Sequence, residues 1–408
     1  MMKRSGKGIC IFLAALCSLW VGQVQAQAGG PLELHGFISQ GYLYSNGNDY
    51  YGPSRDGSFE LTELGLNARY MVTPSLALAA QVVSRRAGEL YDGDPRLDYG
   101  FVDYRLLDGS VVGGVRLGRA KIPIGFYNET RDVATTRPGI LLPQTIYVEG
   151  LGLRDFYTGV DGLHTYWQWF TDRGLFQFDL GLAVPTTMQD ETQAAFLRTQ
   201  DAPGKLRLTS GQNARLLYER DGGALRLGAT YSRVRTEYRP DDLPNPPLEA
   251  GETSVDALVL SAEWNRERLS LTTEGVVRRL HPKGYGPLTD GAFTEAGYYL
   301  QGTYRFNHQW EGFVRHEQHW NDTSDRSGTR QSREFDPVPG VDREPHRFYQ
   351  HQWTVGAGWR PTPQWLLRAE WHHIDGTALT PLADNPEFDQ GGGQARWDLF
   401  ALQASFTF

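Results

Sequence analysis

The last nine residues, 400–408, constrain the fold of this chain more than any other segment. Counting back from the terminal Phe408, every second residue is apolar, and the residues between them are mostly small or polar. The apolar positions are Phe400, Leu402, Ala404 and Phe406. Strict alternation is typical of a β-strand that has one face in an apolar medium and the other in a polar one. Taken alone, the segment fits either an edge strand of a soluble β-sandwich or a strand that crosses a membrane.

The amino terminus predicts export. Three basic residues precede an apolar run over residues 9–21, and a small-residue cleavage pattern ends at Ala26. This is the pattern of a secretory signal peptide, so we expect residues 1–26 to be removed. Cys10 and Cys17 both lie in that segment, and the mature chain therefore contains no cysteine for a disulfide or a metal site.

Composition narrows the class of protein further. The net charge is −8, and removal of the basic signal makes it more negative, which argues against nucleic acid as a partner. Mean hydropathy is −0.47, and no apolar run after the signal is long enough for a helical membrane span. Aromatic residues make up 12% of the chain, which also has 47 glycines. These values suit a barrel in which only one face of each strand meets lipid.

Turn signals divide the chain into hairpins of unequal loop length. Seven short reversals lie at 72–75, 107–110, 171–174, 220–223, 265–267, 307–309 and 360–363. Eight longer polar segments alternate with them, at 45–58, 87–96, 123–155, 185–212, 237–252, 280–293, 322–347 and 375–394. Fifteen connections join sixteen strands, with both termini on the short-turn side. The sequence thus predicts an all-β fold, a 16-stranded antiparallel transmembrane β-barrel with short periplasmic turns and long extracellular loops.

The alternation also assigns strand faces. Leu64 and Leu66 are expected to face lipid and Glu63 the interior, and Phe176 and Leu182 to face lipid. Aromatic residues expected in girdles at the strand ends are Tyr70, Trp169, Tyr218, Trp264, Tyr304, Trp359 and Trp365. Basic residues expected inside are Arg69, Arg85, Arg105, Arg116, Arg215, Arg226, Arg278, Arg305, Arg315 and Arg368. Acidic residues expected inside are Glu63, Asp103, Asp179, Glu219, Glu263, Glu274, Glu311, Glu317 and Glu370. Since the two sets nearly cancel, they assign no ion preference.

Sixteen strands enclose an aqueous channel unless something fills it. The longest connection, residues 123–155, is too apolar for a solvated surface loop, because it contains Ile140, Leu141 and Leu142. We therefore expect the mature chain, residues 27–408, to form one barrel domain in which residues 123–155 fold inward as a constriction.

Residues 115–125 (VRLGRAKIPIG) resemble the fifth-strand pattern of the phosphate-selective porin superfamily, and residues 126–132 (FYNETRD) are similar to a broad group of proteobacterial porins. A carboxyl-terminal Phe408 on an alternating strand resembles the assembly signal of outer-membrane barrels. The resemblance implies a protein of the Gram-negative outer membrane that contacts lipid and lipopolysaccharide, engages the β-barrel assembly machinery and forms a homotrimer. The small-sided outer positions expected at the subunit interface are Leu64, Leu66, Ala68, Leu76, Leu78, Ala80 and Ala404.

Charged residues cluster at the expected constriction. They are Arg116, Arg119 and Lys121 on the fifth strand, and Arg131, Asp132, Arg137, Glu149, Arg154 and Asp155 on the loop. We expect the cations of the strand to face those of the loop across a narrow water-filled gap, where arginine suits carboxylate or phosphate. Asp132, Glu149 and Asp155 then create a transverse field or pair with some of these cations. The alternative is that Arg116 merely pairs with a carboxylate on a neighbouring strand.

The sequence favours passive diffusion of small hydrophilic solutes, with anionic solutes as one option and the choice between anions and cations left open. The alternatives are a surface adhesin or structural barrel whose loops do the work and, less favoured, an outer-membrane hydrolase. Enzymatic activity, a cofactor and a metal site are not expected. His372 and His373 are adjacent on a strand, and so point to opposite faces and cannot together hold a metal in a simple way. The solute itself is not specified by the sequence.

Overall fold

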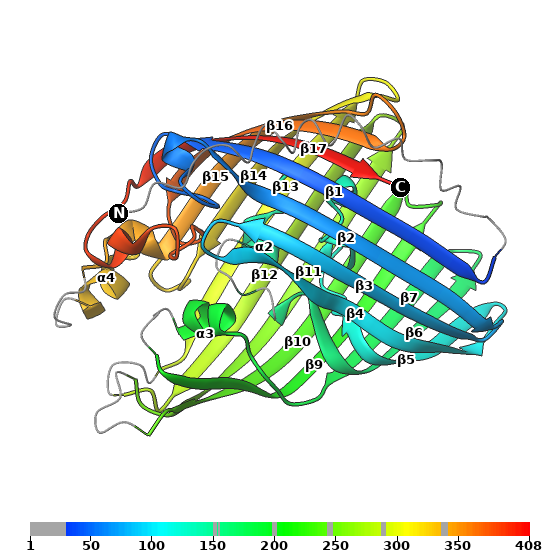
Figure 1. The fold of residues 1–408 in the computed structure, drawn as a ribbon, viewed down its shortest axis with the longest axis horizontal. Coiled ribbons are helices and arrows are strands. Elements are labelled where there is room, and N and C mark those ends of the chain that lie inside the picture. The colour runs from blue at the N-terminus through cyan, green and yellow to red at the C-terminus, as the bar shows by residue number, and fades with distance from the viewer. Residues whose placement is uncertain are drawn as a thin grey trace.

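The computed structural model of the chain is a closed antiparallel β-barrel (Figure 1). It describes residues 30–149, 153, 156–197, 202–242, 248–286, 291–335 and 342–408, so the expected signal peptide, residues 1–26, lies outside the described residues. The sheet holds 17 strands, of which β8 is two residues long and does not cross the barrel. The predicted sixteen-stranded barrel is confirmed.

The strands follow one another around the barrel, and each pairs with its neighbours in sequence, except that β7 pairs with β9 past the short β8. Their bounds are β1 Leu32–Ser45, β2 Ser58–Thr73, β3 Leu76–Ala87, β4 Tyr91–Leu107, β5 Val111–Lys121, β6 Gly159–Thr171, β7 Gly174–Ala183, β8 Thr186–Thr187, β9 Gly204–Arg220, β10 Leu225–Pro240, β11 Gly251–Arg266, β12 Leu269–Lys283, β13 Phe293–Arg305, β14 Trp310–Trp320, β15 Tyr349–Trp359, β16 Trp365–Gly376 and β17 Arg396–Thr407. Pairing of β1 with β17, from Phe37 opposite Thr407 to Ser45 opposite Leu399, closes the sheet. Closure leaves no open edge, as a barrel in lipid requires.

All seven predicted short turns lie at one end of the barrel, called here the turn end, and the opposite end is the loop end. Two loop predictions are wrong in extent. The segment predicted at 87–96 is a loop only over 88–90, because bulged pairing between β3 and β4 lets the strand carry Gly93 and Pro95. The segment predicted at 185–212 contains β8 and α3 (Asp190–Leu197) and already becomes β9 at Gly204.

Short helices occur only in the loops of the described chain. Besides α3 they are η1 (Ser54–Asp56), η2 (Asn128–Thr130), η3 (Ala134–Thr136), α2 (Gln144–Tyr147), α4 (Thr329–Phe335), η5 (Pro345–Phe348) and η6 (Pro386–Asp389). None of the helices in the described ranges has the length and apolar character needed to span a membrane.

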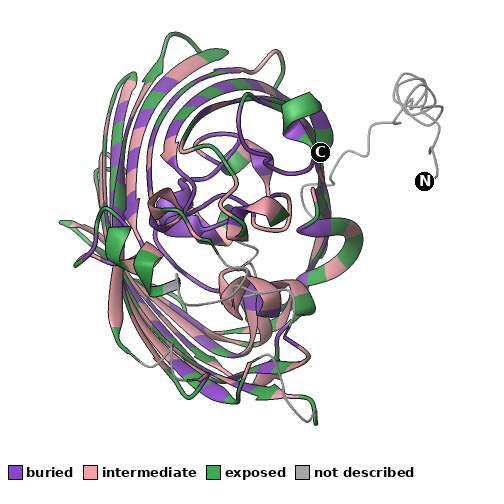
Figure 2. Cartoon of the chain, turned by 90° about the vertical axis from the view of Figure 1, so that its left-hand side faces the viewer, coloured by how far each residue is buried: buried purple, intermediate pink, exposed green. Residues whose placement is uncertain are grey.

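The strand faces agree with the alternation in the sequence. Leu66 and Leu402 are more than half exposed on the outer face, whereas Glu63 and Asp179 are buried inside. Figure 2 shows the same alternation of buried and exposed residues along the strands of the wall. The barrel is therefore apolar outside and polar inside over most of its circumference.

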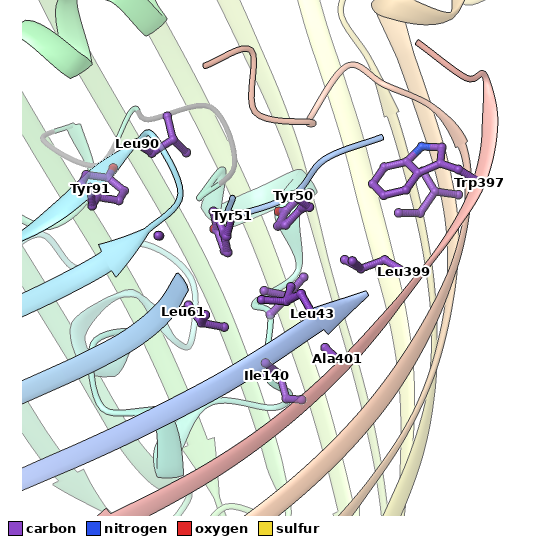
Figure 3. Close-up of a cluster of buried hydrophobic side chains, with 13 residues drawn as sticks. Leu43, Tyr50, Tyr51, Leu61, Leu90, Tyr91, Ile140, Trp397, Leu399 and Ala401 are labelled. Carbon is purple, nitrogen blue, oxygen red and sulfur yellow. The ribbon is translucent and has the colours of Figure 1, made fainter. Parts of the chain in front are cut away.

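One part of the interior is apolar instead. Leu43, Leu61 and Leu399 point inward from β1, β2 and β17 and meet Tyr51 of the first loop and Ile140 of the third (Figure 3). This buried cluster shows that the loops fill a part of the lumen and pack against its wall.

Candidate functional site: the inner loop and the lumen

The connection between β5 and β6, residues 122–158, is called here the inner loop. Its helix α2 lies within the barrel and contacts β12, β13 and β14 (Figure 1). Ile146 and Tyr147 of α2 are fully buried against Val276 of β12 and Tyr299 of β13. Apolar residues in a long connection are therefore buried here by packing against the inner wall.

Tyr147 is the polar anchor of this packing. Its hydroxyl donates a hydrogen bond of 2.6 Å to Glu274 of β12 and accepts bonds from the backbone N–H groups of Phe126 and Tyr127 at 3.1 and 3.0 Å. Tyr299 donates to the same carboxylate at 2.8 Å. Because buried polar groups are costly when unpaired, this arrangement fixes both arms of the inner loop against β12 and β13.

A chain of five buried charges joins the inner loop to β2 and β3. Arg137 binds Glu63 through two hydrogen bonds of 2.7 and 2.9 Å. Arg85 lies 3.2 Å from both Glu63 and Glu149, and Glu149 lies 3.3 Å from Arg131. None of the five residues is more than 6% exposed. We call this set, Glu63, Arg85, Arg131, Arg137 and Glu149, the ion-pair chain.

The electrostatics of Glu149 follow from this packing. Burial alone would raise its pKa, but the neighbouring Arg85, Arg131 and Arg137 lower the pKa to about 2. The carboxylate is therefore charged at neutral pH and is the counter-charge of the buried Arg131, while it shares Arg85 with Glu63.

A second junction involves the base of the inner loop. Lys121, the last residue of β5, forms ion pairs with Asp98 of β4 and with Asp132 of the loop. The expectation that Arg131 and Arg137 face the strand cations across water is wrong, because both are buried and paired with carboxylates. Desolvated like charges would repel, whereas desolvated opposite charges compensate one another.

The remaining predicted site residues lie elsewhere. Arg116 is about one-third exposed inside the barrel, 3.3 Å from Asp103, and its guanidinium lies over the ring of Tyr166. Arg119 contacts Asp161 and the carbonyl of Gly159, both on β6. Arg154 and Asp155 lie outside the described residues.

Wall arginines hold the loop backbone, which sequence reasoning missed. Arg368 of β16 donates to the carbonyls of Ala134, Gly139 and Arg137 at 2.9, 3.2 and 2.7 Å. Arg315 of β14 donates to the carbonyl of Leu141. Strand alternation had placed both arginines inside, but a backbone carbonyl leaves no signal in the sequence that identifies it as their partner.

The lumen is not filled evenly. On β13, β14 and β17, inward side chains such as Tyr299, Arg315 and Leu399 are fully covered. In the half of the barrel nearer the turn end, Arg105 of β4 and Arg116 of β5 are each about one-third exposed. A hollow at the turn end is lined by Glu219, Arg226, Glu263, Asn265 and their neighbours in the turns. Partly exposed inward charges therefore lie near the turn end, on β4 and β5 and around the turns that join β9 to β10 and β11 to β12.

The sequence matches no known family model, and no curated protein matches it. Solved structures do resemble it. An anion-selective porin from Comamonas acidovorans is 15% identical with a TM-score of 0.56, over 92% of this chain and 99% of that one. The outer membrane channel DcaP of Acinetobacter baumannii is 13% identical with a TM-score of 0.56, over 94% and 98%. OmpT of Vibrio cholerae, in a trimer form, is 13% identical with a TM-score of 0.55, over 92% and 99%.

At these identities the likeness concerns the fold, and it extends over nearly the whole length of both chains in each comparison. The porins among these structures do not single out the phosphate-selective superfamily, so that resemblance stays a prediction. The chain has the sixteen-stranded barrel fold of bacterial outer-membrane porins.

Proposed function

We propose that the protein is an outer-membrane channel through which small hydrophilic solutes diffuse passively. The observation that carries this proposal is the uneven filling of the lumen. The inner loop is held against β1–β3, β9–β14, β16 and β17, while Arg105 and Arg116 on β4 and β5 stay partly exposed inside the barrel. Water-filled space lined by polar groups is what a diffusion channel needs.

The inner loop is the constriction in this proposal. Lys121, Arg131, Asp132, Arg137 and Glu149 act by fixing the loop, because their charges are buried in pairs. The charges that solutes meet are instead those left partly exposed. They are Arg116 with Asp103 on the wall, and Glu129 on the loop, which is 2.6 Å from Arg215.

A preference for anions then depends on Arg116 rather than on the loop arginines. Charges in a confined pore are screened less than on an open surface, so removal of one exposed cation changes permeation. We expect Arg116→Ala to shift the reversal potential under a KCl gradient toward cation preference without loss of folding. Arg86→Ala, which removes a cation exposed on another strand and paired with Glu60, is the matched control and leaves the potential unchanged. An unchanged potential in folded Arg116→Ala would place the selective step elsewhere.

We also propose that the barrel is a homotrimer in the outer membrane of a Gram-negative cell, in contact with lipid and lipopolysaccharide. Leu64, Leu66 and Leu78 are exposed on the outer face of β2 and β3, the sector expected at the interface. One similar structure is described as a trimer form, which supports this assembly. A monomer mass in mild detergent would count against it.

A further inference from the structure

We propose that the loop half of the barrel contains a binding site for a small neutral phenol, that is, a ring-sized apolar molecule with a hydroxyl donor. The site is a cavity of about 130 Å³ between the inner loop, β6–β10 and the segment around β8. An apolar cavity of about 150 Å³ accommodates benzene in another protein, so the volume suits one aromatic ring.

A glycine interrupts a row of polar residues that line the cavity. His164, Gly181, Asn213 and Ser232 stand opposite one another on β6, β7, β9 and β10, so their side chains share the inner face. A Cβ atom on Gly181 would lie 3.1 Å from Nδ1 of His164 and 3.9 Å from Cβ of Asn213. The imidazole of His164 thus lies close against the position that a side chain at 181 would take, beside the cavity.

The walls of the cavity are largely apolar. The apolar side chains around it come from the inner loop, β6, β9 and β10, and they include Ile122, Ile124, Phe156, Val160, Leu208 and Val234. The charged pair at its edge, Arg119 with Asp161, is mutually compensated. A neutral ligand with an apolar body is therefore favoured over a free ion.

Two hydrogen-bond acceptors in the cavity would orient the ligand. Asn213 is 7% exposed, and its amide nitrogen donates to Ser232 at 2.7 Å, while its Oδ1 has no hydrogen-bond partner among the described residues. Nε2 of His164 lies 3.4 Å from the carbonyl of Val160, which can only accept, so the neutral ring leaves Nδ1 as an acceptor. A buried acceptor without a partner is costly, and a ligand hydroxyl would satisfy it.

This inference rests on the proposed function only for the route by which a ligand reaches the cavity. Binding is measured by titration calorimetry of the full-length purified barrel in detergent, with phenol and with anisole, against an empty-micelle blank. Anisole has the same ring but no donor. We expect phenol to bind about tenfold more tightly than anisole, the difference that one hydrogen bond supplies.

Asn213→Leu removes the acceptor that lacks a partner at similar volume and leaves only Nδ1 of His164, so that tenfold difference should shrink. Asn67→Leu, the same change on β2 away from the cavity, should preserve it. Gly181→Ala, which adds a methyl group without burying a polar atom, should weaken binding of both ligands. If Asn213→Leu does not fold, this variant tests the site instead.

Three results would overturn the site: no binding of phenol, equal binding of phenol and anisole to the wild-type barrel, or unchanged phenol binding in both folded cavity variants. Conductance of the same preparation separates the two proposals. A conducting barrel that fails to bind phenol overturns the site alone, whereas a phenol-binding barrel that is silent overturns the channel alone.

Discussion

Buried arginines illustrate what a single residue's sequence context can and cannot predict. Alternation along β2 correctly placed Glu63 inside, and the apolar neighbours of Arg137 correctly suggested a loop away from solvent. That Arg137 meets Glu63, 74 positions away, depends on the path of the inner loop through the lumen. No local pattern encodes that path, so the pairing was not predictable, although the need for some carboxylate partner was.

The ion-pair chain predicts a large effect of one neutralising substitution. Glu63→Gln leaves Arg137 and Arg85 buried with less counter-charge, and we expect it to lower the free energy of unfolding by about 3–5 kcal/mol. Glu60→Gln is the control, because Glu60 pairs with the exposed Arg86, and should cost less than about 1 kcal/mol. Urea unfolding in lipid vesicles, followed by tryptophan fluorescence, measures both. Equal losses in the two variants would contradict the structural role of the chain.

Acid stability is a second consequence at this scale. The folded pKa of Glu149, about 2, is below the value of roughly 4.3 for an unfolded glutamate. Its contribution to stability is thus fully present above about pH 5 and is lost as the pH falls toward 2. In urea titrations across this range, Glu149→Gln should be less stable at pH 7 and show a shallower decline on acidification. A decline as steep as in the wild-type barrel would refute this.

At the scale of elements, the strands were predictable and the loop bounds were not. Alternation over β2, β7 or β17 reports burial directly, because side chains on a strand change face at every residue. Residues 92–95 carry Asp, Gly and Pro, which signal a turn, yet bulged pairing with β3 keeps them in β4. Asp, Gly and Pro indicate the backbone conformation that this segment prefers on its own, whereas pairing with β3 determines the conformation that it adopts.

The last strand carries a prediction about assembly. The backbone N–H and carbonyl of Phe408 bond to Gly36 at 3.0 and 3.1 Å, and its half-exposed ring lies over that glycine. If the terminal ring is read by the assembly machinery, Phe408→Ala should reduce folded barrel in cell membranes severalfold while the refolded protein keeps near-normal stability. Thr407→Ala serves as control. A matching loss of stability in vitro would mean that the ring acts by packing alone.

The whole molecule combines a conventional wall with a strongly filled interior. The number of strands, the closure of the sheet and the face of each side chain could be predicted from the sequence. The reason is that the strand pattern repeats sixteen times along the chain. How the loops fill the lumen could not be predicted, because it depends on single contacts between distant segments. Examples are Tyr147 with Glu274 and Arg368 with the loop carbonyls. Whether solutes pass is therefore determined by the folded inner loop, and the central claim is that this loop leaves them a path.

Single-channel conductance of the purified barrel in a planar bilayer tests that claim most directly. We predict discrete, ohmic conductance steps, because the inner loop leaves polar side chains partly exposed on β4 and β5 and around the turns of β9–β12. Replacing residues 128–146 by a short glycine-serine linker should enlarge the steps by removing the constriction. A wild-type barrel that inserts stably, remains folded and carries no current would contradict the proposed channel function.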